Sequence, residues 1–252
     1  MLLVRLQFQM LSKDVVEWTR NYLNSFGGNT KAIIGISGGK DSTIAAKVCV
    51  EAVGADRVIG VLMPEGAQHD IDVSYKVCKY LGIKYYEINI ANPVVALGNV
   101  IGKAMNVNPD DYYVYYSNTP ARFRMTTLYG VAAILGDSRV VNTCNRSEDY
   151  VGYSTKFGDS AGDFSPLSNL TVREVKILGY QLGIPMEFIE KAPEDGLSGK
   201  TDEDNLGFSY NTLDDYLLHG IKPSPEVLEN IERRHRNNLH KLEPMPSYKF
   251  EE

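Results

Sequence analysis

The sequence lacks several features that mark common classes of protein. It contains only three cysteines, and Cys49, Cys78 and Cys144 form no C-x-x-C pair. Their spacing excludes a zinc ribbon and disfavours a disulfide framework, so reduced thiols are expected. No apolar run approaches the ~18 residues that a membrane span needs. The first residues also lack the charged start and small-residue cleavage site of a signal peptide. We therefore expect a cytoplasmic protein that does not contact membranes.

A basic excess is missing as well. The formal net charge is -6, whereas proteins that bind nucleic acids in general usually carry a basic surface. We therefore expect no nucleic acid as partner. With 252 residues and 43% hydrophobic content, the chain can bury a full core. These values favour one domain over residues 1–252 rather than two small ones.

What the sequence does contain is a glycine-rich stretch between a predicted strand and a predicted helix. Residues 31–34 are short, apolar and partly β-branched, and residues 43–50 have helical character. Free N–H groups and the positive end of the helix dipole converge at such a junction. The stretch therefore predicts a seat for phosphates, formed by Gly35, Ile36, Ser37, Gly38, Gly39, Lys40, Asp41 and Ser42.

The spacing within this stretch matches neither of two common phosphate motifs. Ile34 stands where a P-loop needs its first glycine, and Asp41 stands where it needs Ser or Thr. The dinucleotide fingerprint needs Gly-x-Gly followed by a third glycine, and Gly35-Ile36-Ser37 does not match it. A carboxylate beside phosphates is repulsive unless a cation lies between them, so Asp41 implies Mg²⁺. The alternative is a glycine-rich turn without a ligand, which would require neither Asp41 nor the flanking serines.

Strand and helix patterns alternate along the first half of the chain. Strands are predicted over 58–63, 85–90 and 139–143, and helices over 13–26 and 70–81. In the first helix, Ser12 is the expected N-cap and Val15, Trp18, Tyr22 and Phe26 form the expected buried stripe. This alternation predicts an α/β fold with a parallel twisted sheet and helices on both faces. Ligands of such sheets bind at the carboxyl edge of the strands.

A tyrosine-rich stretch precedes a pair of arginines. We expect residues 106–118 to form an ordered loop, either a dimer contact or a stacking platform for a base. Thr119 and Pro120 then predict a helix start. Arg122 and Arg124 would oppose the dipole in its first turns, which favours a bound anion there. The alternative is a solvated surface pair.

The strand predicted over 139–143 would bring further polar residues to the same edge. Thr143 can donate a hydrogen bond to a nucleotide, and Glu148 is either a second metal ligand or a surface acid. The irregular segment 152–163 has the character of a functional loop. Thr171 begins a capping box, and Ser224 with Pro225 predicts the start of the last helix.

Several runs together carry a resemblance to a known family. Ser37–Ser42 resembles the pyrophosphate loop of the N-type ATP pyrophosphatases. Residues 145–150, 152–159 and 162–163 closely resemble the ammonia-dependent NAD synthetases, as do 121–122, 191–193, 201–203, 206–207 and 213–217. The resemblance covers roughly residues 12–245.

The resemblance implies a Rossmann-like fold of the adenine nucleotide α-hydrolase type and a ligase reaction in two steps. The carboxylate of nicotinic acid adenine dinucleotide (deamido-NAD) attacks the α-phosphate of ATP and releases pyrophosphate. Ammonia then displaces AMP from the acyl-adenylate to give NAD. The implied cofactor is Mg²⁺, with ATP as co-substrate, and the implied assembly is a homodimer.

The resemblance also implies roles for individual residues. Residues 35–42 match the ATP phosphate loop, in which Lys40 serves catalysis. Asp41 and Glu148 match metal ligands, and Thr143 matches an ATP contact. Arg124 is a further candidate for a phosphate contact, and Asp159 for orienting or deprotonating ammonium. The residues that contact deamido-NAD in the family are matched here by Arg122, Lys156, Asp163, His240 and Lys241.

Two positions depart from the family pattern. Val172 replaces a lysine that contacts ATP in many relatives, and Arg173 beside it would point about 100° away on a helix. Glu194 stands where many relatives have a Ser or Thr that contacts ATP. Two alternatives remain for it: its backbone lines the ATP site, or its side chain faces solvent. The chain also has no room for the amidase domain of glutamine-using relatives, which leaves ammonia as the nitrogen source. The runner-up function is a tRNA-modifying adenylating enzyme, although catalytic cysteine pairs and a basic domain are missing.

Overall fold

The structure is a computed structural model that describes the backbone of residues 2–190 and 201–250, and the side chains of 10–190 and 201–250. Its sheet comprises β1 (Lys31–Gly35), β2 (Val58–Leu62), β3 (Lys84–Glu87) and β4 (Ser138–Val140) in the order β3-β2-β1-β4. All three strand pairings are parallel, and Ile33 of β1 lies opposite both Ile59 and Val140. The predicted parallel α/β sheet is confirmed.

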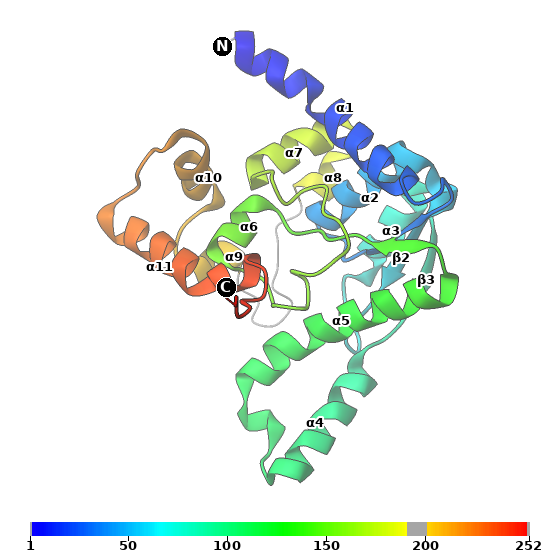
Figure 1. Cartoon of the computed structure of the whole chain (residues 1–252), viewed down its shortest axis with the longest axis vertical. Helices are drawn as coiled ribbons and strands as arrows, with labels where there is room; N and C mark the ends of the chain where they lie inside the picture. The colour runs from blue at the N-terminus through cyan, green and yellow to red at the C-terminus, as the bar shows by residue number, and fades with distance from the viewer. Residues whose placement is uncertain (1, 191–200, 251–252) are drawn as a thin grey trace.

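Helices cover both faces of this sheet (Figure 1). Ala32 and Ile34 of β1 pack into a core shared with α1 (Leu2–Asn24), α2 (Lys40–Val53), α3 (Ile71–Leu81), α7 (Val172–Gln181) and α8 (Met186–Ile189). Ile33 points the other way and packs with Met125 and Leu128 of α5 (Tyr113–Leu135). The alternation along β1 follows from the period of two in a strand. A short 3-10 helix, η1 (Ala55–Arg57), connects α2 to β2.

The first helix begins earlier than the sequence predicted. α1 starts at Leu2, so Ser12 lies inside it and is not its N-cap. The buried face carries Val16, Thr19 and Leu23, whereas Trp18 is 48% exposed. The predicted stripe was wrong at Trp18 because its ring lies over the surface and stacks on Tyr22 instead of entering the core. Phe26, beyond the helix, is also exposed.

The predicted tyrosine-rich loop over 106–118 is wrong. α4 (Ala91–Met105), the 3-10 helix η2 (Pro109–Asp111) and α5 together form a helical arm that extends away from the sheet (Figure 1). The Tyr115 hydroxyl donates to the Val94 carbonyl at 2.8 Å, and the Tyr116 hydroxyl donates to Asp110 at 2.7 Å. The first bond holds the start of α5 against α4 and the second holds it against η2, and the tyrosines lie within helix.

The same finding corrects the helix start at Thr119. Pro120 lies inside α5, not at its first position. Arg122 and Arg124 therefore lie in the middle of the helix, where its dipole places no positive pole. The argument for an anion at a helix start beside these arginines does not hold, and any binding role must rest on other contacts.

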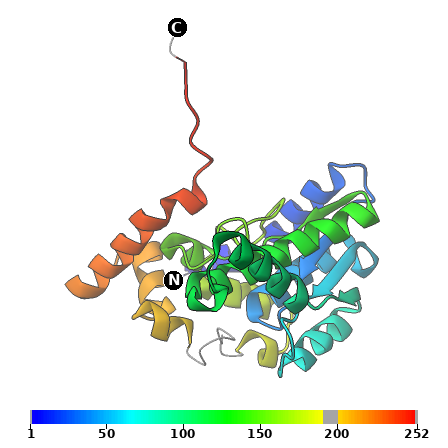
Figure 2. The ribbon, with the colours of Figure 1, turned by 90° about the horizontal axis from the view of Figure 1, so that it is seen from below.

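The second half of the chain adds a smaller core beside the sheet. It is built from α6 (Arg146–Val151), α9 (Asp202–Leu206), α10 (Tyr210–His219) and α11 (Pro225–Leu242). Its buried members include Val151, Leu206, Leu213 and Ile231. Gly152 ends α6 at φ +64°, and a Cβ there would lie 2.1 Å from the Cβ of Asn238, so only glycine allows α11 to pack this closely. Beyond α11 the chain is extended and leads away from the body (Figure 2).

Several other local predictions are confirmed. Thr171 caps α7 in a capping box, and α11 begins with Pro225 directly after Ser224. The helix predicted over 70–81 is α3. In the part of the chain that the structure describes, no helix combines the length and apolar character needed to cross a bilayer.

Candidate active site

The glycine-rich loop lies between β1 and α2, at the carboxyl edge of the sheet, as predicted. Its serines close it internally: Ser37 Oγ accepts from the Gly39 N–H at 3.2 Å and lies 3.0 Å from Ser42 Oγ. Gly38 has φ +78°, and a Cβ there would lie 3.2 Å from atoms of Val73 and Ser74. Glycine is therefore required at this turn. The loop presents its backbone at the N-terminus of α2, where an anion is favoured.

Lys40 and Asp41 form an ion pair in the first turn of α2. The Lys40 ammonium lies 2.7 Å from Asp41 Oδ2, with the lysine side chain only 7% exposed. Burial alone would lower the pKa of Lys40, but the charges of Asp41 and Glu148 outweigh it and raise the pKa above its usual value. Lys40 therefore stays protonated and supplies a buried positive charge beside the loop.

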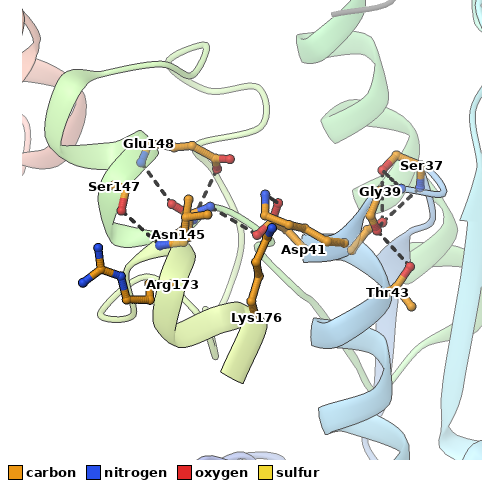
Figure 3. A network of polar contacts seen from close by, with 12 residues as sticks. Ser37, Gly39, Asp41, Thr43, Asn145, Ser147, Glu148, Arg173 and Lys176 are labelled. Atoms are coloured by element: carbon orange, nitrogen blue, oxygen red, sulfur yellow. Dashed lines mark hydrogen bonds and ion pairs between the residues drawn. The ribbon is translucent and has the colours of Figure 1, made fainter. Parts of the chain in front are cut away.

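Asn145 joins the two carboxylates that the sequence singled out (Figure 3). Its amide nitrogen donates to Asp41 Oδ1 at 3.2 Å, and its backbone N–H donates to Glu148 Oε2 at 3.4 Å. Its amide oxygen accepts from the Glu148 N–H at 3.0 Å, which completes a capping box at the start of α6. Asn145 is fully buried. Sequence reasoning missed it as a site residue, although an Asn three residues before Glu is a recognisable cap signal.

The donor set suits a hard cation such as Mg²⁺. Burial, followed by the negative charge of Asp41, raises the pKa of Glu148 well above its usual value. Lys40 balances one negative charge in this desolvated place, and a cation would balance the second carboxylate. No group of three or more His, Cys, Asp or Glu side chains with metal-binding geometry occurs among the described residues. A cation bound here would take only part of its ligands from the protein, and phosphate oxygens and water would supply the others.

A second group of polar residues assembles around the loop 152–163. Arg122 Nε donates to the Lys156 carbonyl at 3.2 Å. The Lys156 ammonium donates to the His240 carbonyl. Lys241 donates to the carbonyls of Gly152 and Ser154, both at 2.7 Å. Four of the residues expected to contact deamido-NAD, from α5, the loop and α11, are therefore linked in one region.

Asp159 and Asp163 lie in the same loop but differ in their bonding. Burial raises the pKa of the Asp159 carboxyl, while the Thr155 N–H, at 2.8 Å, and the charge of Lys241 oppose that rise. Asp163 accepts from the Val140 N–H at 2.7 Å and from the Tyr129 hydroxyl at 3.0 Å. Asp163 thus anchors the loop to β4 and α5.

The remaining predicted residues are placed as follows. Arg124 donates from Nε to the Met63 carbonyl at 3.2 Å, at the end of β2, and burial lowers its pKa. Thr143 is half-buried just beyond β4. Val172 is buried and its N–H bonds Ser147, while Arg173 pairs with Asp215 at 2.8 Å. Arg173 therefore does not replace the missing lysine. Glu194 lies outside the described residues.

Comparisons with known proteins identify the family of this chain. The NAD synthase family model matches residues 11–251. The NH(3)-dependent NAD(+) synthetase of Pyrococcus furiosus is 36% identical over 251 residues, covering 94% of this chain and 93% of that protein.

Two solved structures extend the comparison. The NMN synthetase of Francisella tularensis superposes with a TM-score of 0.86 at 32% identity, covering 96% of this chain and 99% of that one. The NH3-dependent NAD synthetase of Campylobacter jejuni, solved with a nitrate ion, gives 0.75 at 27% identity, covering 96% and 99%. The chain described here belongs to the NAD synthase family.

Proposed function

We propose that this chain is an ammonia-dependent NAD synthetase, which amidates deamido-NAD at the expense of ATP and releases AMP and pyrophosphate. The observation that carries the proposal is the joining of Asp41 and Glu148 through Asn145, directly beside the phosphate loop. Family membership and the curated relatives named for this activity support it. They do not favour the alternative of a tRNA-modifying enzyme.

The phosphate loop would hold ATP during the first step. The substrate carboxylate oxygen attacks the α-phosphorus, and the bond to the bridging oxygen of pyrophosphate breaks. Charge then grows on pyrophosphate, where preorganised donors lower the barrier. Lys40 is buried and protonated, so its ammonium would turn from Asp41 to the departing phosphates. Asp41 and Glu148 would hold Mg²⁺, which when bound neutralises part of the phosphate charge.

The linked residues around 152–163 would bind deamido-NAD. Arg122, Lys156 and Lys241 bring three cations to one region, which suits a ligand with a pyrophosphate and a carboxylate. His240 would contribute to the same site. Asp159 has a raised pKa and lies near the Lys241 charge, so it would accept a proton from ammonium. Ammonia then attacks the acyl carbon, and the C–O bond to AMP breaks.

The arm would mediate a homodimer. Tyr113 is 75% exposed, and Val100 and Val114 are each 66% exposed. Apolar side chains gathered on one projecting helical pair are typical of a protein interface. Three buried free thiols fit a reducing compartment such as the cytoplasm. Sedimentation of Val114→Glu tests the dimer, which should become a monomer.

The activity itself is tested by incubating the protein with ATP, Mg²⁺, deamido-NAD and ammonium. Equal amounts of NAD and AMP should form, and formation should require deamido-NAD. Production of ADP, or AMP release independent of deamido-NAD, would contradict the proposal. Glu148→Gln is the matched variant, because it keeps the shape of the side chain and removes the charge.

Nicotinic acid mononucleotide is a second candidate substrate. The TM-score of 0.86 to an NMN synthetase exceeds that of 0.75 to the Campylobacter NAD synthetase. The same chemistry would then amidate nicotinic acid mononucleotide, which lacks the adenylate half of deamido-NAD. Initial rates with both substrates under identical conditions decide between them. If kcat/KM is higher for the mononucleotide than for deamido-NAD, the mononucleotide is the preferred substrate and the main assignment is wrong.

A further inference from the structure

The hydroxyl of Tyr210 is buried in the smaller core but forms no hydrogen bond within the described residues. Tyr210 begins α10, and Ser209 caps that helix by accepting from the Thr212 N–H at 3.1 Å. The residue is only 6% exposed. Its hydroxyl oxygen is shielded from solvent and has no hydrogen-bond partner among the residues that the structure describes. Buried polar groups without partners are uncommon, and each calls for an explanation.

α10 is held firmly against the helix that carries Glu148. Asp214, which is 1% exposed, accepts from Ser147 Oγ at 2.6 Å and from the Arg173 N–H at 2.8 Å. Ser147 is the neighbour of Glu148 on α6. Tyr210 precedes Asp214 by four residues, so both lie on the same face of α10.

The surroundings of Tyr210 point to the same place. It packs in the small core with Val151, which lies one turn after Glu148 on α6. Burial first, and then the charges of Glu148, Asp202 and Asp41, raise the pKa of Tyr210 far above its usual value. The hydroxyl is therefore a neutral donor that experiences the charges of several carboxylates, including both expected metal ligands.

We propose that Tyr210 is a positioning residue for the cation site: its hydroxyl donates a hydrogen bond to the Glu148 carboxylate when that carboxylate binds a divalent cation together with Asp41. The proposal rests on the proposed function only in taking these two residues as metal ligands. A metal-binding carboxylate is itself hydrogen-bonded in well-formed sites, and loss of such a partner lowers metal affinity about 10–100-fold.

Glu148 Oε2 now accepts only a long bond of 3.4 Å from the Asn145 N–H, and the proposal requires the carboxylate to exchange this weak bond for one from Tyr210. Forming the new bond would give the orphan hydroxyl a partner and orient the carboxylate.

Binding of Mn²⁺ to the full chain, measured by electron paramagnetic resonance with a non-hydrolysable ATP analogue, tests the proposal. Tyr210→Phe keeps the ring and removes only the hydroxyl. We expect its Mn²⁺ affinity to fall about tenfold, with a melting temperature equal to or above that of the unmodified protein. Tyr216→Phe is the matched control on the same helix, because its hydroxyl already donates to Glu232. It should lose stability and keep its Mn²⁺ affinity.

Two results would overturn the proposal: unchanged Mn²⁺ affinity in Tyr210→Phe, or an equal loss of affinity in Tyr216→Phe. NAD formation by the unmodified protein is scored separately. If NAD forms while Tyr210→Phe binds Mn²⁺ normally, only the role of Tyr210 fails. If no NAD forms but Tyr210→Phe binds Mn²⁺ weakly, the proposed function fails and the role of Tyr210 stands.

Discussion

Replacing Asn145 by serine or alanine separates its two tasks. Its amide oxygen caps α6, and its amide nitrogen holds Asp41. Serine is a good N-cap but too short to reach Asp41, so Asn145→Ser removes mainly the second task. Asn145→Ala removes both. The backbone bond from residue 145 to Glu148 remains in either variant.

The magnitudes follow from the bonds that each variant loses. A hydrogen bond to a charged group contributes about 1.5–3 kcal/mol, and Lys40 still pairs with Asp41, so the lower end applies. Asn145→Ser should therefore lower the free energy of unfolding by about 1.5 kcal/mol. Asn145→Ala adds about 1 kcal/mol for the lost cap. If the binding of ATP and metal through Asp41 is weakened by the same amount, about 1.5 kcal/mol, KM for ATP should rise about tenfold in both variants.

Denaturant unfolding and steady-state kinetics measure these effects. Thr171→Ala is the control, because Thr171 caps α7 in the same way, is also fully buried and has no bond to Asp41. It should lose about 1 kcal/mol of stability and keep the KM for ATP. The reasoning is refuted if Asn145→Ser leaves that KM unchanged, or if Thr171→Ala raises it equally.

Two further perturbations test the loop and the packing of α11. Lys40→Met removes the buried ammonium, so kcat should fall about 100-fold while KM for ammonia stays; a kcat within threefold of the unmodified value would exclude Lys40 from the chemistry. Gly152→Ala combines φ +64° with a Cβ only 2.1 Å from Asn238, and should cost at least about 2 kcal/mol of stability. Its control is Gly82→Ala, where φ is +65° and the space is open; equal losses in the two variants would show that packing against α11 contributes nothing.

The elements near the phosphate loop could be predicted because local signals agree there. Residues 32–34 are apolar and buried, the glycines end the strand, and Gly54 ends the helix that follows. Burial of β1 and β2 on both faces made their sequences unambiguous. Thr171 likewise marked a helix start through its capping box, and Pro225 marked another by following Ser224 at the first helical position.

The arm and α1 could not be predicted because tertiary contacts override local signals there. Pro120 is a strong sign of a helix start, yet Tyr115 and Tyr116 bond to the preceding segment and carry helix through it. Trp18 has the hydrophobicity of a core residue, but Val16 and Thr19 occupy the buried face. Asn145 was missed as a site residue because its bond to Asp41 joins positions that are distant in sequence.

Transfer of oxygen from the substrate carboxylate tests the central claim most directly. Deamido-NAD labelled with ¹⁸O in its carboxylate is converted with ATP, Mg²⁺ and ammonium, and the AMP is analysed by mass spectrometry. An acyl-adenylate intermediate predicts one ¹⁸O atom in the phosphate of each AMP formed, with unlabelled pyrophosphate. AMP without label, or label in inorganic phosphate accompanied by ADP, would contradict the assigned reaction.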